Sequence, residues 1–316
     1  MDDGNTGPRQ SFATLRALVT RFEQAPGPTR AIIWAISAGL LFSALNMMVR
    51  RLTLELHPFQ TQFLRHLFGL IVMLPLILRA GWRAYLPVSA RGHFSRGAVH
   101  TVGISLWFIA LPHLALADTT AIGYTGPIFT MILAAWLLGE TMRWDRWLAA
   151  ALGFAGVMIV VGPRLAGSGG WYSLIMLASA PIFSLSFLLT KLLTRHDSPA
   201  VIVVWQGIAV STLSLPLALW FWSWPTTAQW ITFALAGVLG SAGHFCLTHS
   251  LKAADMSATQ SAKFLDLIWA TAWGFLIFGD QPSSATLAGG LVIIGATVWI
   301  ARRESRRIRQ AAASAS

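Results

Sequence analysis

The sequence predicts an all-α polytopic membrane protein in which ten transmembrane helices form two inverted five-helix repeats. Composition gives the class, because 55% of the 316 residues are hydrophobic and only 11% are charged. A soluble domain carries about 25% charged residues, so this chain has too few to cover a soluble surface. Ten apolar segments each approach the roughly 20 residues that a spanning helix needs. The second half of the chain also repeats the pattern of the first, which gives the two-repeat arrangement.

The internal repeat is visible in residues that recur at an offset of 141 positions. The matches are Phe42-Ser43 with Phe183-Ser184, Pro58 with Pro199, and Leu74-Pro75-Leu76 with Leu215-Pro216-Leu217. Five spans per copy is an odd number, so the second copy must cross the bilayer in the opposite sense to the first. Doubled apolar chains of this kind are typical of secondary transporters, whose binding cavity lies near the bilayer midplane between the repeats.

The ten predicted spans are separated by glycine, proline and charged residues. In chain order they are 31–49, 60–79, 97–115, 119–138, 146–163, 171–191, 200–221, 229–250, 257–278 and 284–301. The first repeat therefore covers residues 31–163 and the second covers 171–301. Glycines in the fifth and tenth spans, such as Gly156 and Gly289, are predicted to let helices pack closely.

Polar segments flank the two repeats, residues 1–30 before them and a basic tail at 302–316 after them. The first apolar span starts only near Ala31, so we expect no cleavable signal peptide. In the leading segment, Phe12, Leu15, Val19 and Phe22 fall on one helical face beside basic residues. That pattern is typical of a short helix on an anionic membrane surface, and the alternative is a basic tail without regular structure.

Lysine and arginine divide unequally between the two sides of the membrane. Eighteen of the 23 fall on the side that holds both termini, and only Arg50, Arg51 and Arg164 fall on the other. This excess predicts that both termini lie in the cytoplasm. The net charge of +11 does not indicate nucleic-acid binding, because the basic residues flank apolar spans and form no stripe on one face. The single cysteine, Cys246, excludes an intrachain disulfide.

Two charges lie within the predicted span 257–278. Lys263 and Asp266 are three residues apart and so share one face of a helix. Charges inside a bilayer cost several kcal/mol and usually face a cavity or a partner. The pair is interpreted either as a substrate or proton site or as an internal salt bridge.

Arg65, within span 60–79, is the other charge at membrane depth, and His66 follows it. The repeat partner of Arg65 is the neutral Gln206, which suggests a role specific to the first repeat. A guanidinium suits a carboxylate because it donates two parallel hydrogen bonds. The alternative is an arginine that reaches the headgroups of the outer leaflet.

Histidines and aromatic residues complete the candidate set. His100 and His244 could relay protons, or could be neutral hydrogen-bonding residues in the core. Trp107 could form an aromatic wall for a substrate, or could belong to the core or the membrane interface. Tyr124 lies in a cluster with Gly123, Gly126 and Pro127 that weakens the helix at the start of span 119–138, as often happens at transporter cavities. The alternative is a close helix crossing at small residues.

Motifs for other chemistry are missing from the sequence. It contains no phosphate-binding loop, no dinucleotide fingerprint and no H-E-x-x-H. His244 and His249 are five residues apart, which is not a spacing that places two metal ligands on one helical face. We therefore predict no catalytic residue, no cofactor and no metal. A membrane-embedded enzyme is the alternative from another class, but no spacing assembles a nucleophile with a base. A structural or sensory membrane protein would not need buried charges at symmetric positions.

The repeated pattern resembles the drug/metabolite transporter superfamily, specifically the ten-helix EamA type. The residues that carry this resemblance are Ala117-Asp118, Pro127, Leu138-Gly139-Glu140, Gly153 and Gly156 in the first repeat, and Asp255, Gly279-Asp280 and Gly295 in the second, with Leu267 in place of Pro127. The resemblance covers residues 31–301 and implies a basket of helices around a central cavity in the inner membrane. Family members often carry an arginine in the second helix, which Arg65 matches.

The function expected is secondary transport, as an exporter or importer, of a small polar metabolite such as an amino acid or a derivative, by alternating access. Arg65 would bind a carboxylate and Asp266 an amine or a proton, while Lys263 would favour the ionised form of Asp266. The partners are a small-molecule substrate and the lipid bilayer, with protons as a candidate coupling ion. The alternative within this class is a carrier of S-adenosylmethionine-, nucleoside- or vitamin-type metabolites.

Overall fold

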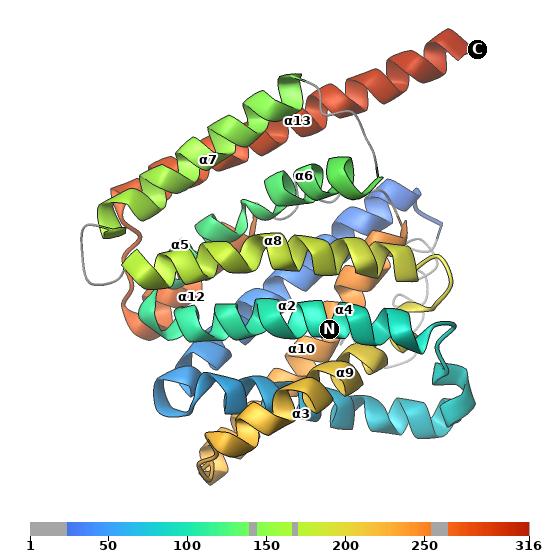
Figure 1. Cartoon of the computed structure of the whole chain (residues 1–316), viewed down its shortest axis with the longest axis vertical. Coiled ribbons are helices and arrows are strands. Elements are labelled where there is room, and N and C mark those ends of the chain that lie inside the picture. The colour runs from blue at the N-terminus through green and yellow to red at the C-terminus, as the bar shows by residue number, and fades with distance from the viewer. Residues whose placement is uncertain (1–23, 139–143, 166–169, 254–264, 316) are drawn as a thin grey trace, which may run out of the picture.

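The protein is described by a computed structural model that covers residues 24–138, 144–165, 170–253 and 265–315 (Figure 1). These residues contain helices and no strand. The helices are α2 (Gly27–Glu55), α3 (Pro58–Ala80), α4 (Ala90–Ala110), α5 (Leu116–Gly123), α6 (Gly126–Leu138), α7 (Trp144–Leu165), α8 (Gly170–Leu193), α9 (Pro199–Trp220), α10 (Thr227–Ala253), α12 (Leu265–Phe278) and α13 (Ser284–Ala315), with short 3-10 turns at Trp82–Tyr85 and Leu111–His113.

Each of the ten predicted spans overlaps helix in the described residues. Six helices, α2, α3, α4, α8, α9 and α10, are long and apolar enough to cross a membrane. The apolar stretches of α7, α12 and α13 are shorter, at Ala151–Pro163, Ile268–Phe278 and Ser284–Ala296. The structure therefore supports a nearly all-helical membrane protein, and the number of ten spans stays a prediction.

The fourth predicted span is divided in two. Helix α5 ends at Gly123 and α6 begins at Gly126, so the break falls on the Gly and Pro cluster that predicts it. Thr125 bridges the break, because its hydroxyl donates to the Ile122 carbonyl at 2.8 Å while its own carbonyl accepts from the Ile128 N–H at 2.9 Å. Irregular backbone at membrane depth is tolerated where it lines a cavity or is buried in protein.

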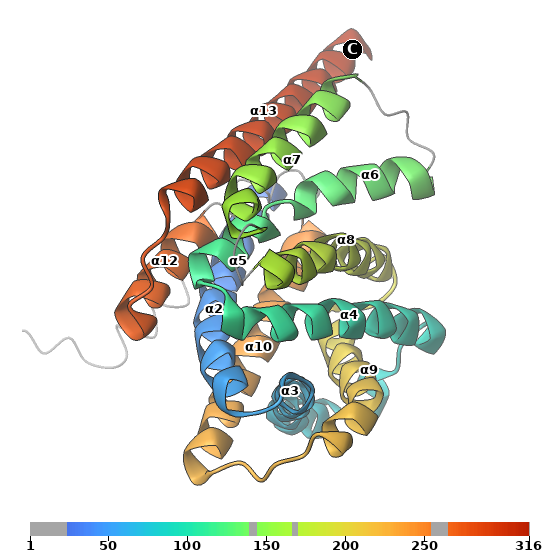
Figure 2. The same cartoon turned by 60° about the vertical axis from the view of Figure 1, so that its left-hand side comes forward.

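The main contacts between helices follow the repeat, because each contact either joins two equivalent helices or has an equivalent contact elsewhere in the bundle. Helix α2 packs on α10 and its repeat equivalent α8 packs on α4, while α3 packs on α9 and α7 on α13. A two-fold relation between the halves produces this pattern. Figures 1 and 2 show α7 and α13 side by side along one flank of the bundle. There a Cβ added at Gly156 or Gly289 would lie 2.9 or 2.5 Å from the other glycine's carbonyl oxygen, so the close-packing role predicted for these glycines is confirmed.

Several helices extend further than predicted, and two of these extensions, in α13 and α4, involve basic residues. Helix α13 continues to Ala315, so the basic residues after position 301 belong to the same helix as the last span. Helix α4 begins at Ala90, and Arg96, which the sequence groups with the preceding loop, is 2% exposed inside the bundle. The predicted N-terminal surface helix, Glu140 and Lys263 lie outside the described residues.

Candidate functional site

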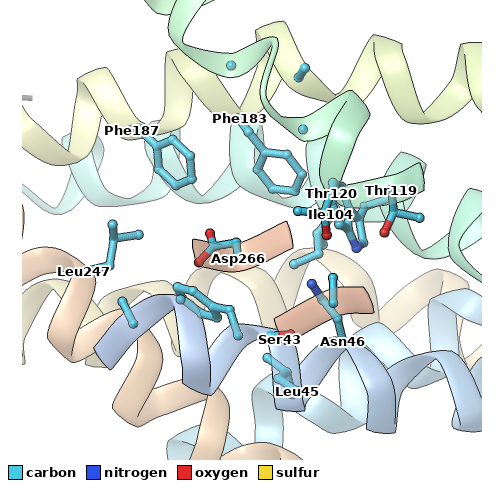
Figure 3. Close-up of a pocket in the computed structure, with 18 of the residues that line it drawn as sticks. Ser43, Leu45, Asn46, Ile104, Thr119, Thr120, Phe183, Phe187, Leu247 and Asp266 are labelled. Atoms are coloured by element: carbon cyan, nitrogen blue, oxygen red, sulfur yellow. The ribbon is translucent and has the colours of Figure 1, made fainter. Parts of the chain in front are cut away.

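A cavity of about 250 Å³ lies at the centre of the bundle. Its walls come from α2, α3, α4, α5, α6, α8, α10 and α12, and therefore from both repeats. Figure 3 shows Asp266 between a wall with Phe183 and Phe187 and a wall of α2 that carries Ser43 and Asn46. Helices from both halves enclose the space, as expected for inverted-repeat transporters.

One side of the cavity is aromatic. Trp107 and Phe183 meet edge to face with ring centroids 5.9 Å apart, and Phe187 stacks on Phe183 at 6.2 Å. Phe42 and Tyr124 also line the space. Aromatic faces of this kind attract flat rings and cations. The cavity can therefore bind a substrate that carries a planar group.

Arg65 supplies a positive charge to the wall. It is 4% exposed, and among the described residues it has no ion pair or hydrogen bond, with its Nε recorded as buried and unpartnered. Its guanidinium rests on Gly240 of α10, where an added Cβ would lie 2.2 Å from Nη2. Only glycine at position 240 leaves room for this placement. The sequence prediction put Arg65 at membrane depth, and the structure places it at the cavity.

Among the described residues, Asp266 is the acidic residue that lines the cavity. It lies in the first turn of α12, and its carboxylate rests on Gly39 of α2, where an added Cβ would come 2.0 Å from Oδ1. Glycine at position 39 thus makes space for the carboxylate. Because Lys263 lies outside the described residues, its pairing with Asp266 stays a prediction.

A buried polar layer lies behind Arg65. Arg96 donates to the Thr190 hydroxyl at 2.6 Å and to Gln206 Oε1 at 2.7 Å. Gln206 Nε2 in turn lies 2.9 Å from His100 Nε2 and 3.1 Å from His244 Nε2. His66 Nδ1 lies 2.8 Å from the Gln62 carbonyl oxygen. The layer joins α3, α4, α8, α9 and α10, so it connects both repeats.

Three histidines of this layer converge, with ligand nitrogens of His66, His100 and His244 all within 4.8 Å of one another. The predicted absence of a metal rests on the spacing of His244 and His249, which cannot reveal a set contributed by three helices. Two features oppose a cation here. Arg65 and Arg96 are neighbouring positive charges, and the amide of Gln206 already contacts a nitrogen of two of the three rings. The arrangement therefore favours hydrogen bonding by these rings over binding of a metal ion.

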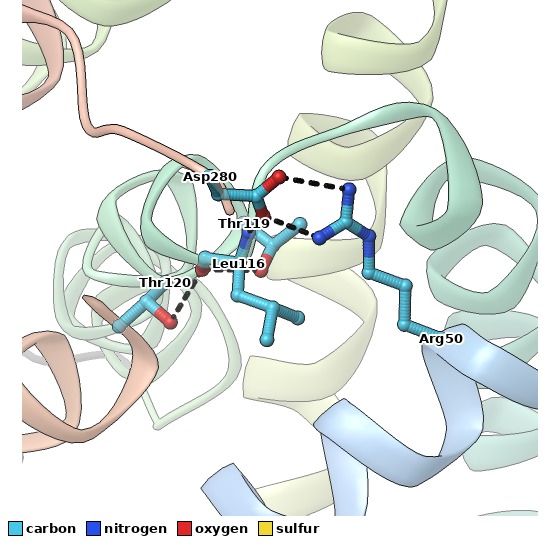
Figure 4. Close-up of polar contacts among 5 residues, drawn as sticks. All are labelled: Arg50, Leu116, Thr119, Thr120 and Asp280. Carbon is cyan, nitrogen blue, oxygen red and sulfur yellow. Dashed lines mark hydrogen bonds and ion pairs between the residues drawn. The ribbon is translucent and has the colours of Figure 1, made fainter. Parts of the chain in front are cut away.

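An ion pair lies next to the cavity, beside Leu116. Arg50 of α2 binds Asp280, which follows Gly279 in the link from α12 to α13, and the second contact, from Nη2 to Oδ1, spans 3.3 Å (Figure 4). Asp280 also accepts from the Leu116 N–H at 3.4 Å, and Leu116 lines the cavity. The Arg50 guanidinium lies 4.3 Å from the Phe278 ring centroid. These contacts join α2, α5 and the α12–α13 link at a single point.

Comparison with known proteins agrees with this architecture. The sequence profile of the EamA-like transporter family matches residues 29–162 and again residues 170–302. The chain belongs to this family. One solved crystal structure shares the fold with a TM-score of 0.62 at 21% identity, over 87% of this chain and 98% of the other.

Relatives with assigned functions are transporters of small metabolites. A riboflavin transporter of Rhizobium johnstonii is 32% identical over 292 residues, which cover 90% of this chain and 96% of the relative. An S-adenosylmethionine uptake transporter of Rickettsia prowazekii is 28% identical, covering 87% and 93%. A pseudopaline exporter of Pseudomonas aeruginosa is 26% identical, covering 86% and 95%. This EamA-family chain is accordingly a multi-pass membrane transporter for a small metabolite and not an enzyme.

Eight of the nine candidate residues from the sequence gather in one region of the structure. Six line the cavity: Arg65, His100, Trp107, Tyr124, His244 and Asp266. His66 and Gln206 stand directly behind it, and Lys263 lies outside the described residues. Their functional roles stay predictions. Sequence reasoning did not identify Asn46, Phe183 or Arg96. The repeat match of Phe42-Ser43 to Phe183-Ser184 is the signal that could have pointed to Phe183.

Proposed function

We propose that this transporter carries an amino-acid derivative with a planar ring across the inner membrane by alternating access. The observation that carries the proposal is Arg65, a buried cation without an acidic partner among the described residues, in the wall of an aromatic-lined cavity. A buried charge is costly unless it is paired, and the partner that Arg65 lacks among the described residues is a negative charge. A substrate carboxylate supplies it.

The guanidinium and the carboxylate fit each other in shape as well as charge. Arginine donates two parallel hydrogen bonds to a carboxylate, which fixes the orientation of the bound group. Gly240 holds the guanidinium in place from the side of α10. Binding at Arg65 therefore orients the substrate relative to the rest of the cavity.

The rest of the cavity suits the remaining parts of such a molecule. Asp266 is the acidic group for an amine, and Lys263 would favour its ionised form. Phe183, Phe187 and Trp107 form the surface for a planar ring. A small aliphatic amino acid would leave these rings without contact. S-adenosylmethionine, which relatives are named for, combines a carboxylate, an amine and a purine ring.

A second candidate is a vitamin-type substrate that resembles riboflavin. The aromatic wall would hold its flat ring system, and a relative named as a riboflavin transporter is 32% identical to this chain. For such a molecule Arg65 would donate to ring carbonyl oxygens instead of a carboxylate. The two candidates therefore differ in how much they depend on the charge of Arg65.

Alternating access requires that each end of the cavity closes in turn. The contact of Arg50 with Asp280 and Leu116 is proposed as one of these closures. The predicted orientation, with both termini in the cytoplasm, would place this end on the outer side. Breaking this contact would open the cavity outward.

Uptake into proteoliposomes tests the proposed substrate. The compounds are labelled S-adenosylmethionine, riboflavin and phenylalanine, with leucine as an aliphatic amino acid for comparison. Each is measured against protein-free liposomes, in both loading directions so that export and import are both detected. We expect saturable S-adenosylmethionine transport that excess unlabelled compound abolishes. Saturable transport of riboflavin alone would favour the second candidate. Transport of aliphatic amino acids in preference to all three would contradict both.

A further inference from the structure

We infer that Gln206 is a positioning residue which, oriented by Arg96, holds His100 and His244 neutral and makes His244 an N–H donor to the substrate. The inference rests on the proposed function, because it adds a second donor beside Arg65 in the same site. It also assigns a role to the buried layer behind the cavity, which the binding of a carboxylate and an amine leaves unexplained.

The first step fixes the orientation of the Gln206 amide. A guanidinium only donates hydrogen bonds, so the atom of Gln206 that lies 2.7 Å from Arg96 Nη2 must be the amide oxygen. Arg96 is itself held from the other side by the Thr190 hydroxyl, 2.6 Å from its Nε. The amide nitrogen of Gln206 therefore faces the histidines.

The second step fixes the protons of the two rings. The Gln206 amide nitrogen has two hydrogens, and it lies 2.9 Å from His100 Nε2 and 3.1 Å from His244 Nε2. Each ring must accept through a lone pair at Nε2, so each carries its proton on Nδ1. His100 then donates from Nδ1 to the Ser186 hydroxyl, which lies 3.2 Å away. Both hydrogens of the amide and both ring lone pairs are satisfied.

The third step concerns the free end of His244. Its Nδ1 has no hydrogen-bond partner among the described residues, and this atom is not fully buried. Because His244 lines the cavity, the Nδ1–H is available to a ligand there. Gly240, which supports the Arg65 guanidinium, lies one helical turn before His244 on α10. The wall thus presents two adjacent donors, one charged and one neutral.

The titratable and charged groups that surround His244 come from three helices. Arg65 and His66 face it from α3, Arg96 and His100 face it from α4, and Asp266 of α12 lies across the same cavity. Phe42 of α2 contributes only an aromatic ring, 4.9 Å away. A second proton on His244 would have to lie on Nε2, where the Gln206 amide already directs an N–H. The geometry therefore assigns His100 and His244 to hydrogen bonding and not to a proton relay, and the substrate places an acceptor beside its carboxylate.

The variant Gln206→Glu tests the assignment, because a carboxylate accepts but does not donate. Each histidine must then donate to the carboxylate from Nε2. A neutral His244 would have no proton left for Nδ1, and it regains the Nδ1–H only if the ring takes up a second proton. We expect the affinity for S-adenosylmethionine to fall about tenfold at pH 8 and to recover as the pH approaches about 5.5. Wild-type affinity should stay constant over that range. The double variant Gln206→Glu/His244→Asn should lose the pH dependence, because asparagine donates without titrating.

Two measurements keep the inference testable if Gln206→Glu does not fold or if S-adenosylmethionine does not bind. In ¹⁵N NMR of histidine-labelled protein, with His100→Asn and His244→Asn used for assignment, both rings should show one protonated and one unprotonated nitrogen from about pH 5.5 to 8.

In the wild-type background His244→Asn should keep riboflavin or S-adenosylmethionine affinity within about threefold, and His244→Leu should lower it about tenfold. An imidazolium signal, a flat pH profile in Gln206→Glu, or unchanged affinity in His244→Leu would overturn the inference. If these fail while Arg65 variants still lose binding, only this inference fails and the proposed function stands.

Discussion

Two arginines are buried to nearly the same extent in neighbouring helices, yet their surroundings differ. Arg96 of α4, 2% exposed, makes hydrogen bonds of 2.6 and 2.7 Å with Thr190 and Gln206. Arg65 of α3, 4% exposed, has no such partner among the described residues and instead borders the cavity. Arg96 is committed to the structure of the bundle, whereas the hydrogen-bonding capacity of Arg65 remains available. We therefore propose a role in stability for Arg96 and a role in substrate binding for Arg65.

The largest effect is expected from Arg65→Gln. Removing the charge should lower the transport efficiency by about 30-fold or more, which corresponds to about 2 kcal/mol for a buried charge pair that loses one partner. Thermal stability should not fall, because the variant also removes a costly buried charge. Proteoliposome uptake and thermal unfolding check the two halves of this prediction. Arg65→Lys is the matched control, since it keeps the charge and loses the two-pronged geometry, and we expect intermediate transport.

Arg96→Gln should give the opposite result. Loss of the guanidinium leaves the Thr190 hydroxyl and the Gln206 oxygen without their donor, at a cost of about 1–3 kcal/mol. Unfolding should therefore shift to lower temperature, while the substrate affinity of the folded fraction changes less than in Arg65→Gln. A stable Arg96→Gln protein together with an unstable Arg65→Gln protein would reverse the roles assigned to the two residues.

If Arg65 binds the substrate, the substrate must reach the cavity by a route that opens and closes. Asp280→Asn weakens the contact with Arg50 and should shift the protein toward the state open at that end. We expect several-fold, up to about tenfold, faster labelling of Asn46→Cys by a membrane-impermeant thiol reagent added outside. The native Cys246 is buried and makes little background. Unchanged labelling, or faster labelling only from the cytoplasmic side, would contradict the proposed outer closure.

The smallest effect is expected from a methyl group. In Gly240→Ala the new Cβ displaces the guanidinium of Arg65, because the two would otherwise lie 2.2 Å apart. Substrate affinity should fall about threefold to tenfold while the expression level is maintained. Gly162→Ala is the matched control, as an added Cβ there meets nothing within 4 Å. Equal affinities in the two variants would mean that the position of Arg65 is not important for binding.

Much of this architecture follows from the sequence because the bilayer demands long apolar helices. The break between Gly123 and Gly126 was predictable from its glycine and proline residues, and Arg65 from its depth in an apolar span. Arg96 was not predictable, because it lies one residue before the apolar segment at 97–115 and reads as part of the loop. Its partners come from the other repeat, and only the folded bundle brings them together.

The same limit applies to the histidines. His66, His100 and His244 come from three helices, so spacing along the chain could not reveal that they converge. Gln206 was identified only as the repeat partner of Arg65. Its role depends on the direction in which its amide points, which Arg96 determines. Sequence periodicity finds the helices, while contacts between the repeats decide what the buried polar residues do.

The most direct test of the account measures whether Arg65 binds the carboxylate of the substrate. Affinities of wild-type protein and Arg65→Gln are compared for S-adenosylmethionine and its decarboxylated analogue by isothermal titration calorimetry. We predict that removing the carboxylate weakens binding to the wild type by at least about tenfold, or about 1.4 kcal/mol, and hardly affects binding to Arg65→Gln. An equal loss in both proteins would show that the carboxylate does not contact Arg65.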